Sequence, residues 1–166
     1  KNIKIPSSVR FIGQRAFKDC SSLKNILILS TDISIGPFAF ESCSSVILKD
    51  GMKSIPEKMF SDNSLLTKIL IPLSVTHIKN SAFYKCTSLE QITLHSSIIS
   101  IGSDAFYGCS SLKQIIIPSS VTFIGHRAFY CCQSLRELSI PLSLTSMKES
   151  FFQEKDMNSN SESLIS

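Results

Sequence analysis

The sequence predicts a solenoid of the α/β repeat class, in which about six to seven repeats stack along one axis. Two observations predict it. Cysteines recur 23 residues apart in the most regular stretch, at Cys86, Cys109 and Cys132. Seven of the 11 phenylalanines also hold one repeat phase, at intervals of 23, 20, 23, 23, 23 and 23 residues: Phe17, Phe40, Phe60, Phe83, Phe106, Phe129 and Phe152.

Each repeat opens with a predicted β-strand. The idealised unit reads L-x-x-I-x-I-P-x-S-V-T-x-I-G-x-x-A-F-x-x-C-x-S. In the run 115–117 the side chains of Ile115 and Ile117 share one face, which is the spacing of a strand. Pro118 and Ser119 follow, and this pair ends a strand and begins a turn. Stacked repeats therefore place these strands side by side in one parallel sheet.

The second half of the unit predicts a different local structure. Phe129 and Cys132 lie three residues apart, which suits a short helical or 3-10 turn. Because one unit cannot bury its own Leu, Ile, Val and Phe, like residues must pack against like in the next coil. The sequence thus predicts a parallel β-sheet on one face of the solenoid and short helical turns on the other.

Some segments depart from the repeat. The unit at 43–63 is three residues short, and alignment places the deletion in the turn before the strand. Asp32 occupies a Val position, so we expect Ile33 to turn inward instead, because a buried charge is costly. We expect the solenoid to span residues 1–155 and the Ser- and Asn-rich tail 156–166 to be disordered. The incomplete first repeat indicates a piece of a longer protein.

Composition and motifs argue against several classes of function. The 17 Lys and Arg and 13 Asp and Glu alternate along the chain, so no basic stripe predicts nucleic-acid binding. No apolar run approaches the ~20 residues of a membrane span. There is no G-x-S-x-G, no phosphate-binding Gly loop and no paired carboxylates, and His77, His95 and His126 fall at three different phases. We therefore expect neither catalysis nor a cofactor.

Five of the six cysteines share one repeat phase: Cys20, Cys43, Cys86, Cys109 and Cys132. A shared phase predicts buried thiols stacked along the core, and no C-x-x-C gives a zinc spacing. Disulfides between neighbouring coils stay open as an alternative, if the Cα atoms come within ~7 Å. Cys131 lies outside this phase, and we expect it to be the more exposed thiol.

The candidate binding residues lie on the predicted sheet. Its outward strand position holds four aliphatic residues among seven: Lys4, Leu27, Ile47, Leu70, Thr93, Ile116 and Ser139. A solvated sheet face is ordinarily polar, so an aliphatic column indicates a partner surface. A polar column flanks it: Asn2, Asn25, Ser45, Lys68, Gln91, Gln114 and Glu137. We expect Leu27, Ile47, Leu70, Thr93, Ile116, Gln91, Gln114 and Lys68 to contact another protein.

Two simpler readings of these surfaces remain open. Aliphatic and β-branched residues favour strands wherever they lie, which would explain the outward column without a partner. A second column follows each repeat Phe and contains all three tyrosines, Tyr84, Tyr107 and Tyr130. These rings offer a contact strip, or they only pack between coils with their hydroxyls in water.

The repeat, best seen here as LKQIIIPSSVTFIGHRAFYCCQS, resembles the BspA-like leucine-rich repeat family over about residues 1–155. The resemblance implies a leucine-rich repeat solenoid that binds proteins without catalysis. It further implies a cell-surface or secreted adhesin or surface antigen that recognises a host or matrix protein. The alternative is a cytoplasmic scaffold or regulatory subunit. The buried-thiol reading and the absence of any N-x-S or N-x-T sequon favour that alternative.

Overall fold

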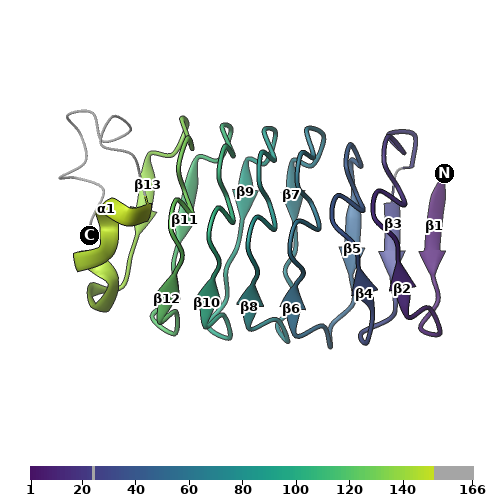
Figure 1. Cartoon of the computed structure of the whole chain (residues 1–166), viewed down its shortest axis with the longest axis horizontal. Coiled ribbons are helices and arrows are strands. Elements are labelled where there is room, and N and C mark those ends of the chain that lie inside the picture. Colours follow the sequence, from purple (N-terminus) through teal and green to yellow (C-terminus); the bar gives the residue numbers. More distant parts are fainter. Residues whose placement is uncertain (24, 152–166) are drawn as a thin grey trace.

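A computed structural model describes residues 1–23 and 25–151 of the chain. These residues form an elongated solenoid in which the chain advances one coil per repeat (Figure 1). Like positions of successive coils lie beside one another, so the predicted repeat architecture is confirmed. Phe152, the boundary at residue 155 and the tail 156–166 lie outside the described residues.

The predicted parallel strands line one side of the solenoid. Strand pairing joins like positions, as in Ile3 with Ile26 and Ile26 with Val46. The strands are β1 (Asn2–Ile5), β3 (Asn25–Ile28), β5 (Val46–Leu48), β7 (Lys68–Ile69), β9 (Gln91–Ile92), β11 (Gln114–Ile116) and β13 (Glu137–Ser139). We call this row the first sheet.

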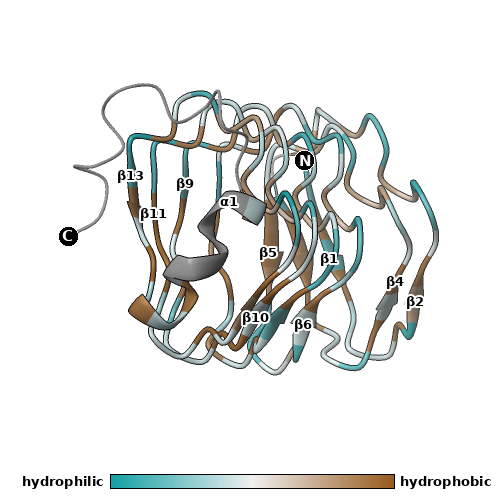
Figure 2. Cartoon of the chain, turned by 60° about the vertical axis from the view of Figure 1, so that its left-hand side comes forward, coloured by the Kyte–Doolittle hydropathy of each residue, from teal (hydrophilic) through white to brown (hydrophobic). Residues whose placement is uncertain are grey.

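A second row of short parallel strands was not predicted. It comprises β2 (Phe11–Ile12), β4 (Ser34–Ile35), β6 (Ser54–Ile55), β8 (His77–Ile78), β10 (Ser100–Ile101) and β12 (Phe123–Ile124). These strands lie on another side of each coil (Figure 2), and we call them the second sheet. Two residues are too few for a detectable alternation, so sequence periodicity assigned this segment to a turn.

The third side of each coil also differs from the prediction. The N–H of Cys109 donates to the carbonyl of Phe106 over 3.1 Å, which is the expected three-residue spacing. However, Asp104 and Gly108, two residues before and after Phe106, both have positive φ (54° and 68°). Left-handed backbone ends a right-handed helical path, and the same two positions are left-handed in each of the six coils from Phe17 to Phe129. These segments are therefore turns.

Within the described residues, helices occur only in the last coil. A 3-10 helix, η1 (Leu142–Met147), is followed by the short helix α1 (Lys148–Phe151). Phe151 is fully buried, and its carbonyl accepts a hydrogen bond from the N–H of Phe129 at 3.2 Å. The last described coil thus keeps the repeat register while its local structure changes.

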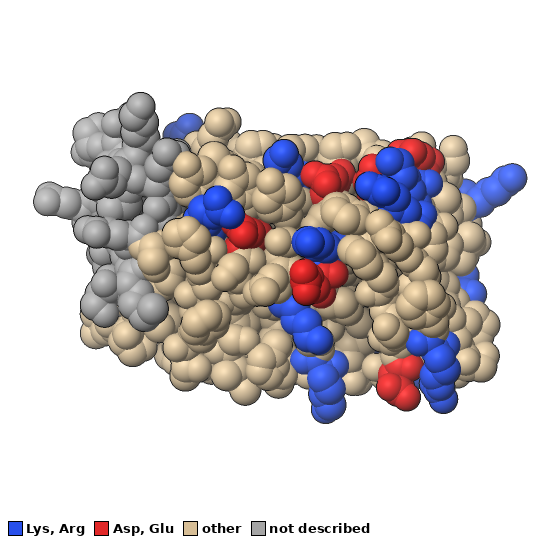
Figure 3. Space-filling model, viewed as in Figure 1, with Lys and Arg blue, Asp and Glu red and all other residues tan. Residues whose placement is uncertain are grey.

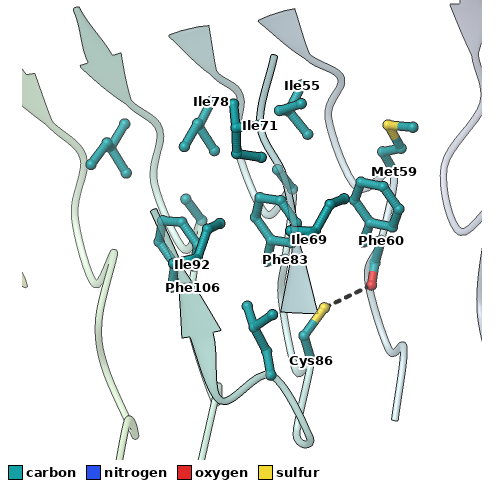
Figure 4. Close-up of a cluster of buried hydrophobic side chains, with 14 of the residues drawn as sticks. Ile55, Met59, Phe60, Ile69, Ile71, Ile78, Phe83, Cys86, Ile92 and Phe106 are labelled. Atoms are coloured by element: carbon teal, nitrogen blue, oxygen red, sulfur yellow. Dashed lines mark hydrogen bonds between the residues drawn. The ribbon is translucent and has the colours of Figure 1, made fainter. Parts of the chain in front are cut away.

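The core is a column of stacked phenylalanines. Ring centroids of Phe60, Phe83 and Phe106 lie 5.2 Å apart, with ring planes within 5° of parallel. Five of the column's side chains are fully buried: Phe40, Phe60, Phe83, Phe106 and Phe129. Isoleucines of both sheets surround these rings (Figure 4). The repeat phase read from the sequence therefore defines the core.

The short repeat interrupts this regular stack. The first sheet is split between β5 and β7, and the second between β4 and β6. The Phe40 and Phe60 rings are also tilted by 31°, whereas the other phenylalanine pairs lie within 7° of parallel. The predicted deletion before β5 accounts for a skewed coil, because the coil has fewer residues to span the same turn.

Pro56 contributes to the split in the second sheet. In the next coil, the N–H of Lys79 donates to the carbonyl of Ile55 at 3.0 Å. The equivalent donor for the carbonyl of Ile35 would be residue 56, but proline has no N–H. Ile33, beside this site, is half-buried and packs on the core while Asp32 is exposed, so the expected inward shift of Ile33 is confirmed.

Candidate protein-binding surface

The outward column forms on the first sheet as predicted. Strand pairing places Lys4 beside Leu27, Leu27 beside Ile47, and Ile116 beside Ser139. The neighbouring residues in each strand, such as Ile115 and Ile117, point inward and are buried. The column is therefore a real geometric feature, with its side chains directed away from the core.

Exposure along this column is uneven. Leu70 is 86% exposed, Ile116 66% and Ile47 45%, and Thr93 between them is also exposed. Leu27 is half-buried and is therefore less exposed than these three residues. An exposed Leu or Ile leaves apolar area in water unless a partner covers it, and these three residues supply most of that area.

The flanking polar column lies alongside. Pairing joins Lys68 to Gln91, Gln91 to Gln114 and Gln114 to Glu137, and all four are exposed. Within the described chain, the side chains of Lys68, Gln91 and Gln114 have no intramolecular hydrogen-bond partner. Asn25, in contrast, already bonds Asn2 and accepts from Ser45. Free donors and acceptors therefore concentrate on β7, β9 and β11.

The split in the first sheet divides the predicted residues into two groups. Leu27 and Ile47 lie on the three-stranded part, β1-β3-β5, and the other six lie on β7, β9 and β11 or at the residue after those strands. Sequence reasoning did not anticipate this division. The three-residue deletion before β5 was the available signal.

The second sheet carries exposed apolar residues that sequence reasoning missed. Phe11 is 64% exposed and Phe123 51%, and Ile99, which directly precedes β10, is 42% exposed. Phe11 and Phe123 belong to opposite ends of the sheet, in β2 and β12. Because the segment was expected to be a turn, its outward residues were not considered as a surface.

The three tyrosines stack as a strip on the turn side. Ring centroids are 4.9 Å apart between Tyr84 and Tyr107 and 5.2 Å apart between Tyr107 and Tyr130. All three are half-buried, and burial raises the pKa of the Tyr107 hydroxyl. Arg127 lies over the Tyr107 ring at 5.5 Å and forms an ion pair with Asp104. Packing between coils accounts for these contacts.

Cysteines of the shared phase bind backbone across coils. The thiols of Cys43, Cys86 and Cys109 each donate to the carbonyl of the phenylalanine one coil earlier, at 3.1 Å. Cys132 does the same at 3.2 Å. All six cysteines are thiols in this structure, and Cys131 is half-buried. Burial raises the pKa of Cys43 to about 12 and raises that of Cys86 and Cys109, so these thiols stay neutral.

Asn63 takes the cysteine position in the short repeat. Its amide donates to the carbonyls of Phe40 and Cys43, at 2.7 and 2.9 Å. Its side-chain oxygen accepts from the N–H groups of Leu65 and Leu66, both at 3.0 Å. This fully buried residue therefore ties its own turn to the turn of the preceding coil where the coil is shortest.

The histidines do not form a chemical site. His95 donates through Nε2 to the carbonyl of Pro72 at 2.7 Å, since a carbonyl can only accept, and His77 contacts Thr76. Within residues 1–23 and 25–151, no three His, Cys, Asp or Glu are grouped so as to hold a metal. Nor does any helix in those ranges have the length and apolar character of a membrane span.

Comparisons with known proteins agree with this geometry. The family model described as BspA type leucine rich repeat region, in six copies, matches residues 1–86 and 53–162. No curated protein matches the chain.

The solved structures that are similar to this chain include three leucine-rich repeat proteins. A leucine-rich repeat protein from Bacteroides ovatus is 30% identical with a TM-score of 0.71, over 84% of this chain and 39% of that one. The T. pallidum leucine-rich repeat protein is 29% identical with a TM-score of 0.55, over 84% and 58%.

A leucine rich cell surface protein from Faecalibacterium prausnitzii is 29% identical, with a TM-score of 0.56, over 82% of this chain and 46% of that one. The chain thus spans less than two thirds of the length of these structures. Its repeat phase, its stacked core and the match of the family model across both halves agree. The chain belongs to the BspA type leucine-rich repeat family.

Proposed function

We propose that this chain is a non-catalytic binding module whose first sheet captures another protein at the cell surface. The observation that carries the proposal is the exposed aliphatic trio Ile47, Leu70 and Ile116 on a strand scaffold. Such residues form the apolar centre of an interface, and Lys68, Gln91 and Gln114 supply its polar rim. The partner in this proposal is a host or matrix protein.

Two comparisons support the location. The F. prausnitzii structure is described as a cell surface protein, and the family model covers most of this chain. Leucine-rich repeats are typical of protein–protein interaction, because stacked repeats present an extended surface. Adhesion to cells or matrix is the function that this combination favours.

The test measures binding of the full chain to immobilised collagen, fibronectin and laminin by surface plasmon resonance. We expect binding to at least one of them. The triple variant Ile47→Lys, Leu70→Lys, Ile116→Lys should weaken it by tenfold or more, because charges replace the apolar centre. Ile47 is chosen in preference to Leu27, which is half-buried.

Leu142→Lys is the matched control, since Leu142 is also 86% exposed but lies in η1. This variant should bind as the unchanged chain does. Circular dichroism must show that all variants stay folded. A folded triple variant with unchanged affinity would refute the first sheet as the binding surface, and no binding to any matrix protein would refute the adhesive role.

A second candidate, an intracellular scaffold, is favoured by one observation. The cysteines of the core are thiols that donate hydrogen bonds to carbonyls, which suits a reducing compartment. Fractionation of the native cell with an antibody to this chain separates the two. Accessibility on intact cells supports the surface module, and its absence supports the scaffold.

A further inference from the structure

The interruption of the second sheet creates a groove between β4 and β6. It has a volume of about 650 Å³ and is lined by residues of the second, third and fourth coils. This volume is within the range of ligand pockets, ~300 to 1,000 Å³. We propose that the groove binds an extended acidic peptide, which adds as a strand between β4 and β6.

The backbone of β4 offers one side for this strand. The N–H groups of Ser34 and Gly36 already bond the carbonyls of Arg10 and Ile12, at 2.9 and 2.8 Å. Alternate residues of a parallel strand bond opposite neighbours, so the backbone groups of Ile35 face β6. Because Pro56 has no N–H, it cannot donate to the carbonyl of Ile35 as Lys79 does to Ile55.

Side chains of the groove fit an alternating peptide. Ile33, Ile35 and Met52 give the lining an apolar part, which suits every second side chain of an added strand. Such strand addition draws affinity from main-chain hydrogen bonds and specificity from the pockets for alternate side chains. The same groove is therefore able to hold a backbone and select its side chains.

The charged residues that line the groove favour an acidic peptide. Lys53, Lys58 and Lys79 line the groove together with Asp32 and Glu57. Glu57 lies 3.8 Å from Lys58 and partly neutralises it. Among the described residues, Lys53 and Lys79 form no ion pair, and both are exposed. Lys and Arg side chains extend from the lower edge of the molecule near β6 (Figure 3). The pKa of the Asp50 carboxyl is lowered chiefly by its hydrogen bonds from Ser74 and also by Lys53, so Lys53 already has an acidic neighbour. The three lysines of the lining outnumber its two carboxylates by one, which leaves one net positive charge for the peptide.

The test titrates the full chain against a fluorescein-labelled octapeptide of alternating Glu and Val, followed by fluorescence anisotropy. We expect it to bind at least tenfold more tightly than the Lys–Val octapeptide. The double variant Lys53→Glu, Lys79→Glu should weaken binding by at least tenfold. The matched double variant Lys68→Glu, Lys113→Glu changes net charge equally, at Lys68 of β7 and at Lys113 just before β11, and should bind as before.

Two further probes separate strand addition from simple charge attraction. A Glu–Val octapeptide methylated on alternate backbone nitrogens should bind at least fivefold more weakly, and equal binding would overturn strand addition. A heparin octasaccharide that binds where the peptide does not would overturn the peptide as ligand. The Ile47, Leu70, Ile116 triple variant should keep the peptide, so this proposal fails or stands independently of the adhesive surface.

Discussion

At the scale of single residues, the repeat phenylalanines form the centre of the core. Phe106 is fully buried between Phe83 and Phe129, with centroids 5.2 and 5.5 Å away. Its ring therefore contacts the coil before and the coil after. Removal of the ring leaves a cavity that both neighbours border, and a stacked core collapses poorly onto such a cavity.

Phe106→Ala should lower the free energy of unfolding by about 3 to 5 kcal/mol, through lost burial and a cavity. Urea titration followed by circular dichroism measures it. Phe11→Ala is the control, since Phe11 is 64% exposed, and it should change stability by less than about 1 kcal/mol. Equal losses in the two variants would contradict a core formed by the repeat phenylalanines.

The sequence predicted the buried cysteine phase but not the chemistry of that position. Cys86 and Asn63 have different side chains, yet each donates a hydrogen bond to the carbonyl of the phenylalanine one coil earlier. Apolar periodicity cannot detect this equivalence, because it scores Cys as apolar and Asn as polar. Knowing that the position needs a hydrogen-bond donor would have placed Asn63 in the core.

At the scale of elements, the first sheet could be predicted and the second could not. Ile115 and Ile117 alternate with exposed neighbours, whereas Phe123 and Ile124 make up a strand of only two residues. We predicted short helical turns on the third side of each coil from the three-residue spacing of Phe and Cys. That spacing carries no information about the backbone angle φ, which is positive at two positions of each of these turns. Only Gly108 among these left-handed positions is a glycine, so the usual sequence signal was missing. The sequence predicted that the candidate site residues occupy outward positions of the first sheet. It did not predict that the break between β5 and β7 separates Leu27 and Ile47 from the other six.

Three glycines that follow second-sheet isoleucines, Gly36, Gly102 and Gly125, lie close against the backbone of the preceding coil. A Cβ on Gly125 would lie 2.2 Å from the backbone N of Ser103, which no real contact allows. On Gly13, the nearest heavy atom would be 3.7 Å away, an ordinary contact. The same substitution therefore clashes with the preceding coil at Gly125 and makes only an ordinary contact at Gly13.

Gly125→Ala should destabilise the chain by at least about 2 kcal/mol, because the backbone at residue 125 must move away from Ser103. Gly13→Ala should change stability by less than about 1 kcal/mol. Differential scanning calorimetry of the two variants compares them directly. Similar melting temperatures would show that the close approach of Gly125 to Ser103 does not constrain the chain.

At the scale of the whole molecule, ion pairs accompany the stacking of coils. Acidic and basic side chains lie next to each other on the face in Figure 3. Several ion pairs join adjacent coils, such as Lys18 with Glu41 at 2.8 Å and Lys113 with Glu90 at 2.8 Å. Exposed pairs such as Lys113 with Glu90 contribute little each, so stability depends chiefly on the buried column.

The buried thiols should make unfolding sensitive to alkali. The pKa of Cys43 rises from 9.0 to about 12 on folding, because burial disfavours the thiolate. This stabilisation is complete below pH 9. It is lost as pH rises from 9 toward 12, because in this range the thiol is ionised in the unfolded chain but still protonated in the folded one. The slope per thiol approaches about 1.4 kcal/mol per pH unit.

Urea titrations between pH 8 and pH 10.5 should show the free energy of unfolding falling above about pH 9. Cys43→Ser retains a donor for the carbonyl of Phe17 but does not titrate in this range, so its decline should be shallower. Parallel pH profiles for the two proteins would mean that Cys43 is not held neutral by the fold.

Because Phe83 meets Phe106 just as Phe106 meets Phe129, the coils of this regular stretch have nearly the same environment. Loss or duplication of one 23-residue unit by in-register recombination would join surfaces that already match. Each such event would lengthen or shorten the solenoid by one coil and would add or remove the outward side chains of that coil. Reach and valency could then diversify between descendants while the packing rule of the interior stays constant.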